Sequence, residues 1–429
     1  MLDIKEKSVS LIGYGISNKA LCKYLIKQGC KPVIRCADTV DVPKGAFGAF
    51  GENYLDTKED VVFRSPSVRP DKIRGDGQVL TEADLALNLC RGFKIGISGS
   101  DGKTTTTTLV HQMLREGGKS AFIGGNIGFP LIKYVPLVKE SDYLVAELSS
   151  FQLMDMTARL HIGAVTSISE NHLDWHAHMD EYICAKSKIT KNASLAVLNY
   201  DDPIVKNLPA QQVTYFSTQN LSHLVERHNV FHIVGGEICY NEIPLFPVKD
   251  ICLKGSFNIQ NVLCAVACTY GIVGKDACHR VAKRFCGVEG RMEEVGTVKG
   301  VKFICSAIDS TPTRTDKTLS AFDKSRVVCI LGGYDKNLSY DLLSQTLQDV
   351  KGVVLCGENS EKIEKSINRH AVRVNTLEEA VTVAYKISSP GDFVILSPAS
   401  ASFDMFKNYH EKASCFKNAV RGITTRCDK

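Results

Sequence analysis

Short apolar runs alternate with amphipathic segments along most of this chain. Residues 8–13 form an apolar run that leads into a glycine turn, and residues 20–28 follow with apolar positions at helical spacing. A second apolar run at 32–36 completes a strand–helix–strand unit. Such units place their strands side by side in a parallel sheet, with helices covering its faces. The pattern therefore predicts an α/β fold from the first residues onward.

Two further regions repeat this alternation. The second has predicted strands at 93–97, 143–146 and 164–168 and predicted helices at 105–116, 258–271 and 276–286. The third has predicted strands at 302–305, 327–331, 352–356 and 393–396. A polar stretch at about 200–250 indicates an antiparallel edge or an insertion within the second region.

We predict three α/β domains from this pattern, because 429 residues exceed what one hydrophobic core usually supports. The first is a Rossmann-like domain at 1–91. The second is a central domain with a mostly parallel sheet at 92–295. The third is a Rossmann-like domain at 296–429.

Composition narrows the class of protein. A hydrophobic content of 44% and a charged content of 23% are ordinary for a soluble globular protein. The net charge of +5 is spread along the chain, so we expect neither nucleic acid nor a membrane surface as a partner. No signal peptide or membrane-spanning run is evident, and a cytoplasmic protein is expected. The sixteen cysteines contain no CxxC pair and are expected to be reduced and mostly buried.

The strongest local signal is a glycine-rich loop at 99–105, between a predicted strand and a predicted helix. Glycines let backbone N–H groups turn toward phosphate oxygens, a lysine neutralises their charge, and a hydroxyl at the helix start is a ligand for Mg²⁺. The alternative is a plain glycine turn before a threonine-rich helix. The residues predicted to contact phosphate are Gly99, Ser100, Asp101, Gly102, Lys103, Thr104 and Thr105. The central domain at 92–295 is therefore predicted to be a P-loop-type ATPase domain.

An acidic residue and a group of histidines follow the loop. Glu147 ends an apolar strand, where a carboxylate faces the crevice at the carboxyl edge of a parallel sheet, and it is a natural ligand for Mg²⁺. The alternative is a helix N-cap. His172, His176 and His178 are also compatible with a zinc site, and thus with a hydrolase, but that interpretation leaves the lysine of the glycine-rich loop unexplained.

The chain resembles the Mur ligase family over essentially its whole length. The blocks that carry the resemblance are 99–105, 124–128, 147–152, 171–176, 185–186, 332–336 and 397–409. They are most similar to the D-glutamate-adding branch of the family. The resemblance implies an ATP-dependent ligase, active as a monomer, that adds D-glutamate to UDP-N-acetylmuramoyl-L-alanine through an acyl phosphate, in peptidoglycan precursor synthesis.

The resemblance also implies a role for individual residues, with the UDP-sugar in the first domain and D-glutamate in the third. The expected catalytic residues are Lys103, Glu147, His172 and Lys186, the last carbamylated by CO₂. The expected Mg²⁺ site uses Thr104, Glu147, His172 and Lys186. ATP is expected to contact the 99–105 loop and Asn258, Asn261, Arg291 and Asp309. The UDP-sugar is expected at Gly15, Ile16, Ser17, Asn126, Ser149 and Gln152, and D-glutamate at Lys336, Ser402, Phe403 and Tyr409.

Two alternatives to this function stay open at the level of sequence. One is another Mur or folate-type ligase, which would share the phosphate loop and the modified lysine. The other is a non-catalytic homologue that binds a nucleotide or a UDP-sugar, because Phe257, Gly290 and Ser306 depart from the residues usual in the family. Phosphate release with and without D-glutamate separates them.

Overall fold

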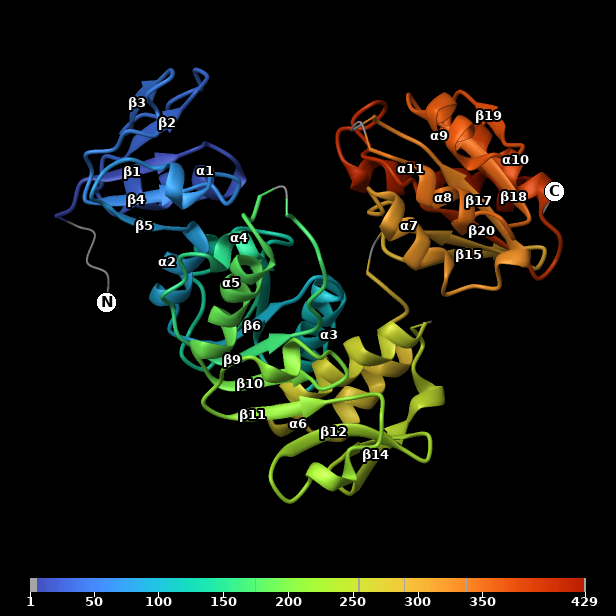
Figure 1. Ribbon diagram of the computed structural model, residues 1–429, viewed down its shortest axis with the longest axis horizontal. Coiled ribbons are helices and arrows are strands. Elements are labelled where there is room, and N and C mark those ends of the chain that lie inside the picture. Colours follow the sequence, from blue (N-terminus) through green and yellow to red (C-terminus); the bar gives the residue numbers. More distant parts are fainter. Residues whose placement is uncertain (1–5, 174, 254, 289, 336–337, 428–429) are drawn as a thin grey trace. The chain divides into compact units, whose positions relative to one another are not determined.

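The computed structural model describes residues 6–427 except 174, 254, 289 and 336–337. Internal contacts divide the chain into two compact units (Figure 1). One comprises Met1–Cys252 and Phe257–Arg284, and the other comprises Leu253–Ser256 and Phe285–Lys429. The chain is α/β with mostly parallel sheets, as predicted. The finer division into domains at 91 and 295 stays a prediction.

The N-terminal sheet is entirely parallel, with the strand order β3-β2-β1-β4-β5. Its strands are β1 (Val9–Ile12), β2 (Val33–Cys36), β3 (Phe47–Phe50), β4 (Val61–Arg64) and β5 (Gln78–Leu80). Helix α1 (Ile16–Lys27) joins β1 to β2, so the predicted strand–helix–strand opening is confirmed. Helix α2 (Glu82–Leu89) then leads into the second sheet.

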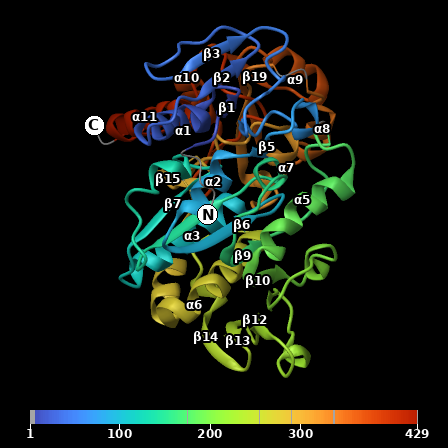
Figure 2. The same cartoon turned by 90° about the vertical axis from the view of Figure 1, so that its left-hand side faces the viewer.

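The second sheet has nine strands in the order β14-β13-β12-β11-β10-β9-β6-β8-β7. Its parallel strands are β6 (Phe93–Ser98), β7 (Ala121–Gly125), β8 (Tyr143–Glu147), β9 (Leu160–Val165), β10 (Ala193–Asn199) and β11 (Val213–Phe216), with β12 (Asn229–Val234) parallel to β11. Strands β13 (Glu237–Tyr240) and β14 (Ile243–Pro247) complete an antiparallel edge with β12 (Figure 2). The antiparallel edge predicted in the polar stretch at 200–250 is thereby confirmed.

The third sheet, in the second unit, has the order β15-β16-β20-β17-β18-β19. Its strands are β15 (Glu293–Val298), β16 (Val301–Cys305), β17 (Val327–Leu331), β18 (Gly352–Cys356), β19 (Val372–Val374) and β20 (Phe393–Leu396). Only the β15–β16 pair is antiparallel. The helices of this unit are α7 (Pro312–Leu319), α8 (Asp341–Thr346), α9 (Ser360–Ile367), α10 (Leu377–Ile387) and α11 (Tyr409–Cys427).

One predicted strand differs from the structure in its bounds, whereas two predicted helices agree with it. The strand predicted at 164–168 is β9, Leu160–Val165, because the chain leaves the sheet at the polar residues that follow Val165. The two helices predicted at 258–271 and 276–286 are confirmed, because the segment α6 (Ser256–Arg284) consists of two helices separated by a kink at Gly274. Gly274 has φ 74° and ψ 175°, a conformation that glycine adopts without a steric penalty.

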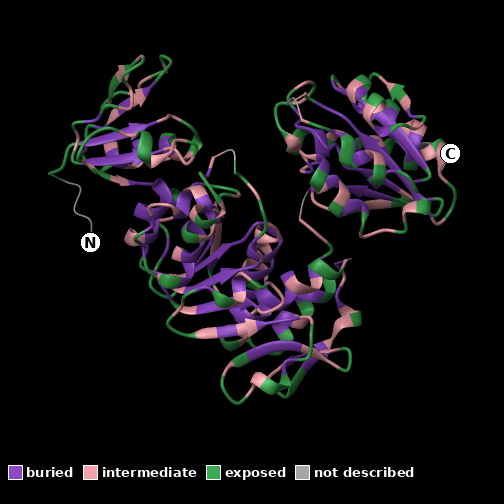
Figure 3. Ribbon diagram, in the orientation of Figure 1, coloured by how far each residue is buried: buried purple, intermediate pink, exposed green. Residues whose placement is uncertain are grey.

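The strands of each sheet are largely buried (Figure 3), as expected when helices cover both faces. α6 is long and apolar enough to cross a membrane by composition, but 56% of its most apolar window is buried, which is typical of a core helix. Most cysteines in the described part of the chain are buried free thiols. Cys252 and Cys286 are disulfide-bonded, which corrects the expectation of reduced cysteines at these two positions.

Candidate active site

The glycine-rich loop lies between the end of β6 and the start of α3 (Lys103–Glu116). Gly102, at the N-cap of α3, has φ 77°, and a Cβ there would lie 2.1 Å from Oδ1 of Asn261. Gly99 has φ 148°, and its Cβ would lie 1.9 Å from Oγ1 of Thr166. Only glycine fits at these two positions, and the close turn leaves the first N–H groups of α3 available for phosphate oxygens.

Lys103 and two hydroxyl residues complete the loop. Lys103 Nζ donates to the carbonyl oxygens of Gly99 at 2.8 Å and Ser100 at 2.9 Å, so the ammonium group is held over the loop. Ser100 Oγ lies 2.8 Å from the hydroxyl of Tyr182, which ties the loop to a neighbouring helix. Thr104 is buried in the first turn of α3. The arrangement is suited to binding phosphates, and phosphate binding by these residues stays a prediction.

Glu147 ends β8 and is paired in register with Ile97 of β6, so its carboxylate lies at the strand end that carries the loop. Its Oε1 accepts a hydrogen bond from Asn126 Nδ2 at 2.7 Å. Its Oε2 is buried and has no hydrogen-bond partner among the described residues. A buried carboxylate oxygen without a donor is costly, and a hard cation is the partner that compensates it.

The residues around Glu147 therefore fit Mg²⁺ in the way that is usual for nucleotide-binding sites. Mg²⁺ is commonly held by one or two carboxylates and completes its shell with phosphate oxygens and water. Within the described residues, no three His, Cys, Asp or Glu side chains cluster as a dedicated metal cage.

Lys186 lies on α5 (Met179–Lys191) and is only 1% exposed. Its Nζ donates to the carbonyl oxygen of Gly99 at 2.8 Å and to Ser98 Oγ at 3.3 Å. Burial, followed by the charge of Lys103, lowers the pKa of Lys186 well below its usual range. The structure thus brings a lysine with a readily deprotonated amine directly beside the glycine-rich loop.

The three histidines of the 172–178 segment make different contacts. His172 packs edge-on against Phe151, with ring centroids 4.9 Å apart. His176 is buried, with Nε2 2.9 Å from Ser150 Oγ and Nδ1 3.2 Å from a carboxylate oxygen of Glu181. His178 is the N-cap of α5 and accepts from the Glu181 N–H.

Both ring nitrogens of His176 and Nδ1 of His178 therefore have protein partners in the structure. This arrangement does not support the zinc alternative. Asp174, which lies within the same segment, is outside the described residues.

The residues assigned to the UDP-sugar fall into two groups. Gly15 and Ile16 are exposed at the start of α1, and Ile16 is 77% exposed, which leaves this turn open to a ligand. Ser17 follows in the first turn of α1. Sequence reasoning missed the part played by Asn18, whose buried Nδ2 donates to the Gly13 carbonyl at 2.8 Å and to Phe63 O at 3.2 Å.

Three further residues of this set follow strands of the second sheet, within the same compact unit. Asn126 is held on Glu147 by the hydrogen bond described above. Ser149 and Gln152 form a capping box at the start of α4 (Ser150–Leu153), in which Gln152 Oε1 accepts from the Ser149 N–H at 2.9 Å. Both side chains therefore stabilise a helix terminus, and their contact with a sugar stays a prediction.

The predicted ATP-binding residues are distributed over both units. On α6, Asn261 Nδ2 donates to Asn258 Oδ1 at 3.0 Å, and Asn261 Oδ1 accepts from Thr106 Oγ1 at 3.4 Å, which brings this pair to the phosphate loop. Arg291 and Asp309 belong to the second unit. Asp309 is 5% exposed and accepts hydrogen bonds from two hydroxyl groups, Thr318 at 2.7 Å and Ser397 at 2.8 Å.

Asp309 is buried within its own unit, and this burial raises the pKa of its carboxyl group. Its contact with ATP was suggested by the resemblance and stays a prediction.

Three of the residues assigned to D-glutamate follow β20 in the chain. Ser402 is buried and Phe403 is 65% exposed, both shortly after β20, and Tyr409 begins α11. Lys336, in the loop after β17, lies outside the described residues. The carboxyl end of a parallel sheet is the usual place for ligands in α/β folds.

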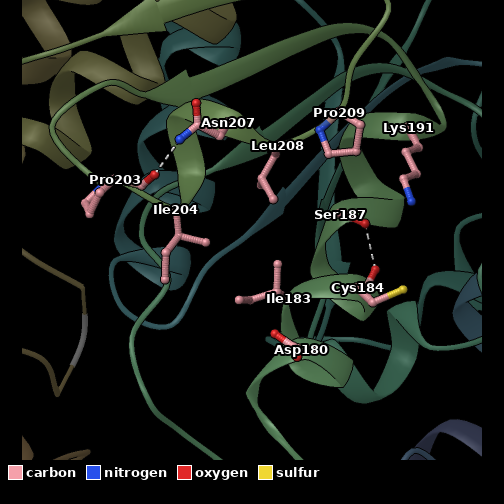
Figure 4. A pocket seen from close by; sticks show the side chains of 10 residues that line it. All are labelled: Asp180, Ile183, Cys184, Ser187, Lys191, Pro203, Ile204, Asn207, Leu208 and Pro209. Atoms are coloured by element: carbon pink, nitrogen blue, oxygen red, sulfur yellow. Dashed lines mark hydrogen bonds between the residues drawn. The ribbon is translucent and has the colours of Figure 1, made fainter.

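A surface hollow lies elsewhere, between α5 and residues 203–209 (Figure 4). Its lining includes Asp180, Cys184, Ser187 and Lys191 from α5. No residue of the predicted catalytic set is in this lining, so the hollow is separate from the glycine-rich loop.

Comparison with known proteins gives the family. The Mur ligase middle domain matches residues 97–269, and the Mur ligase glutamate ligase domain matches residues 290–400. The chain is 38% identical to the UDP-N-acetylmuramoylalanine–D-glutamate ligase of Acetivibrio thermocellus, covering 98% of this chain and 97% of that one. It is 37% identical to the enzyme of the same name from Clostridium perfringens, covering 98% of each.

Solved structures share the fold at lower identity. UDP-N-acetylmuramate-alanine ligase MurC from Thermotoga maritima matches with a TM-score of 0.62 and 18% identity, covering 97% of this chain and 100% of that one. MurF ligase from the same organism, in complex with ADP, matches with a TM-score of 0.60 and 16% identity, covering 99% of this chain and 98% of that one. The chain belongs to the Mur ligase family.

Proposed function

We propose that this protein is an ATP-dependent ligase that joins D-glutamate to UDP-N-acetylmuramoyl-L-alanine in peptidoglycan precursor synthesis. The identity of 38% to ligases of that name, over 98% of this chain, supports the choice of substrates. The observation in the structure that carries the proposal is the grouping of Lys103, Glu147 and Lys186 around the glycine-rich loop. This grouping is suited to transfer of a phosphoryl group.

The proposed reaction has two steps. The alanyl carboxylate of the UDP-sugar attacks the γ-phosphorus of ATP, which forms an acyl phosphate and releases ADP. The amine of D-glutamate then attacks the acyl carbon, so an amide bond forms and phosphate leaves with the electron pair of the broken C–O bond. The amine loses a proton in this step.

The chain's own residues position the reactants and offset charge. The backbone N–H groups at the start of α3 and the Lys103 ammonium stabilise the phosphates, which are most negative as the phosphoryl group is transferred. Glu147 and Thr104 would hold Mg²⁺, together with His172 and Lys186. Mg²⁺ supplies charge neutralisation between the phosphate oxygens when it is bound.

We also propose that Lys186 is carbamylated in the active protein. The ammonium first loses a proton, and the neutral amine then adds to the carbon of CO₂ and releases a second proton, so an anionic carbamate oxygen replaces the cation. Support comes from the burial of Lys186 and its position beside Gly99, because an unmodified ammonium would repel a divalent cation at that place. The resemblance to the family suggested this residue.

The remaining substrates are assigned to the predicted domains. We propose that residues 1–91 bind the UDP-sugar at the exposed turn before α1, and that residues 296–429 bind D-glutamate at the carboxyl ends of β17 and β20. The proposed enzyme acts as a monomer in the cytoplasm. A three-substrate reaction of this kind gains most of its rate from holding the reactants in the correct orientation.

Phosphate release is the test of this function. The purified protein is mixed with ATP, Mg²⁺ and UDP-N-acetylmuramoyl-L-alanine, and release is measured with D-glutamate, with L-glutamate, with other amino acids and with none. Release that depends on D-glutamate supports the proposal. Release with another amino acid indicates a different Mur ligase, and release that needs a folate acceptor indicates a folate-type ligase. Nucleotide binding without release under any condition indicates the non-catalytic homologue.

A further inference from the structure

A buried lysine lies beneath the loop that follows β17 in the second unit. Lys412, on α11, is 1% exposed, and its Nζ donates to the carbonyl oxygen of Gly332 at 2.7 Å. A Cβ added to the next residue, Gly333, would lie 3.2 Å from the same Nζ, so the ammonium is in close contact with two successive residues of the loop. Burying an ammonium costs free energy unless it is hydrogen-bonded, so the contact with Gly332 is a strong constraint on both partners.

The same loop is held from its other side by a buried asparagine. The Gly333 N–H donates to Asn359 Oδ1 at 2.8 Å, and the Asn359 N–H donates to the Gly333 carbonyl at 3.1 Å. Asn359 Nδ2 donates to the Tyr340 hydroxyl at 2.6 Å and to Ser400 Oγ at 2.5 Å. Asn359 is 2% exposed, so all four bonds are shielded from water. One side chain therefore links the loop after β17 to the loop after β20.

Backbone hydrogen bonds join these two loops directly. The Gly332 N–H donates to the Pro398 carbonyl at 2.9 Å, and the Tyr334 N–H donates to the Ala401 carbonyl at 2.9 Å. The approach is so close that a Cβ on Gly333 would lie 2.2 Å from the Ala401 carbonyl oxygen. Because the loops touch backbone to backbone, a shift of either one displaces the other.

We propose that Lys412 and Asn359 are positioning residues that hold the 332–335 and 397–402 loops together and so set the affinity for the incoming amino acid. The inference rests on the proposed function, in which these loops carry the D-glutamate pocket. Ser402 directly follows Ala401, which is hydrogen-bonded to Tyr334, so the register of this bond fixes where Ser402 lies. Neither Lys412 nor Asn359 is placed in contact with substrate.

The carboxylate of Asp404 interacts favourably with the charge of Lys412. Asp404 Oδ2 accepts a hydrogen bond from the Glu358 N–H at 3.2 Å, next to Asn359. The Asp404 carboxylate favours the charged form of Lys412, whereas burial has the larger effect and lowers the pKa of Lys412 to about 8. Because this pKa lies above neutral pH, Lys412 is mainly charged there, and its hydrogen bond to the Gly332 carbonyl is charge-assisted.

The test uses the full-length protein and the variants Lys412→Met, Lys412→Arg and Asn359→Ala. Lys412→Met keeps the length of the side chain but removes the donor to Gly332. We expect the KM for D-glutamate to rise by about tenfold or more, the loss typical of one charged hydrogen bond, while the KM values for ATP and the UDP-sugar change by less than about twofold. Lys412→Arg restores a donor and is expected to recover most of the affinity for D-glutamate.

Lys417→Met is the matched control, because Lys417 lies on the same helix but pairs with Glu293 at 2.8 Å. It is expected to leave the KM for D-glutamate within about twofold. Amide hydrogen exchange at Gly333 and Tyr334 is measured in each variant, since their N–H groups carry the loop contacts. Exchange is expected to accelerate by about tenfold or more in Lys412→Met and Asn359→Ala, and to stay unchanged in Lys417→Met.

Unchanged exchange in a folded Lys412→Met protein overturns the inference. Faster exchange with an unaltered KM for D-glutamate also overturns it, because the loops would then move without affecting the pocket. If the parent protein does not use D-glutamate at all, the proposed function fails. In that case the inference is decided by the exchange rates and by the same KM comparison with whichever amino acid the parent accepts.

Discussion

Lys186 and Lys103 donate to one oxygen, the carbonyl of Gly99, each with Nζ at 2.8 Å. The two lysines reach it from different helices, α5 and α3. Two cations at one acceptor repel each other, and this repulsion adds to burial in lowering the pKa of Lys186. The glycine-rich loop is thus held by one lysine that faces the predicted phosphate site and by another that is enclosed behind it.

Replacing Lys186 by alanine is expected to reduce D-glutamate-dependent phosphate release to near background. The physical reason is loss of the anionic oxygen that the carbamate would provide. Formate or acetate at millimolar concentration, entering the vacated space, is expected to restore part of the activity. Phosphate release with and without these carboxylates is the measurement.

The control for this substitution is Lys191→Ala, which removes an exposed lysine from the last turn of the same helix and is expected to have normal activity. Normal activity of Lys186→Ala in CO₂-depleted buffer would show that no carbamate is needed. The Mg²⁺ site would then have to be assigned to Glu147, His172 and Thr104 without Lys186.

Lys103→Ala is expected to abolish phosphate release while binding of the UDP-sugar survives. The substitution removes the cation held over the loop by Gly99 and Ser100, where the phosphates of ATP are predicted to bind. Calorimetric titration measures the affinity for the UDP-sugar, and a phosphate assay measures turnover. Retained turnover, with correct folding, would exclude the phosphate-loop assignment.

Lys336→Ala is expected to raise the KM for D-glutamate far more than the KM for ATP, because a charged hydrogen bond to the amino acid is lost. The expected cost in binding free energy is about 1.5–3 kcal/mol. Ser402→Ala is expected to act in the same direction with a smaller effect, since its hydroxyl group is uncharged. Equal increases in both KM values would instead point to misfolding or to a different pocket.

Glu82→Gln is expected to make stability less dependent on pH. Glu82 is 2% exposed, its Oε1 accepts from the Ile132 N–H at 2.7 Å, and burial raises its pKa from 4.5 to about 7. Between these two values the folded protein binds more protons than the unfolded chain, so the Glu82 contribution to stability falls as pH rises from about 4.5 to 7.

Glutamine keeps the acceptor for Ile132 and cannot ionise. The variant is therefore expected to exceed the parent in the free energy of unfolding at pH 8, by up to about 3 kcal/mol, with the difference shrinking toward pH 5. Urea denaturation at pH 5 and pH 8 measures this difference in the free energy of unfolding. Glu140→Gln, which changes an exposed glutamate, serves as the control. A difference that does not change with pH would contradict the assignment.

Much of the local structure of this protein could be predicted from the sequence. Apolar runs of strand length identified β1, β2, β6, β8 and the four parallel strands β16, β17, β18 and β20 close to their observed bounds. The glycine-rich loop was also recognisable, because a strand, a glycine turn and a helix start lie next to one another in the chain. At β9 the predicted bounds were wrong by several residues, because the pattern was ambiguous there. The break in α6 at Gly274 lies within the gap predicted between two helices.

The tertiary structure decided which side chains meet. Lys186 Nζ reaches Gly99, which is 87 residues away in the chain, and Asn126 reaches Glu147 across neighbouring strands. Lys412 reaches Gly332 from a helix 80 residues later, and nothing in its local sequence distinguishes it from a solvated lysine. Such contacts depend on the order of strands in each sheet and on which helix covers which face. Periodicity identifies a strand or a helix from its own residues, but burial of a lysine depends on the neighbours that folding brings around it.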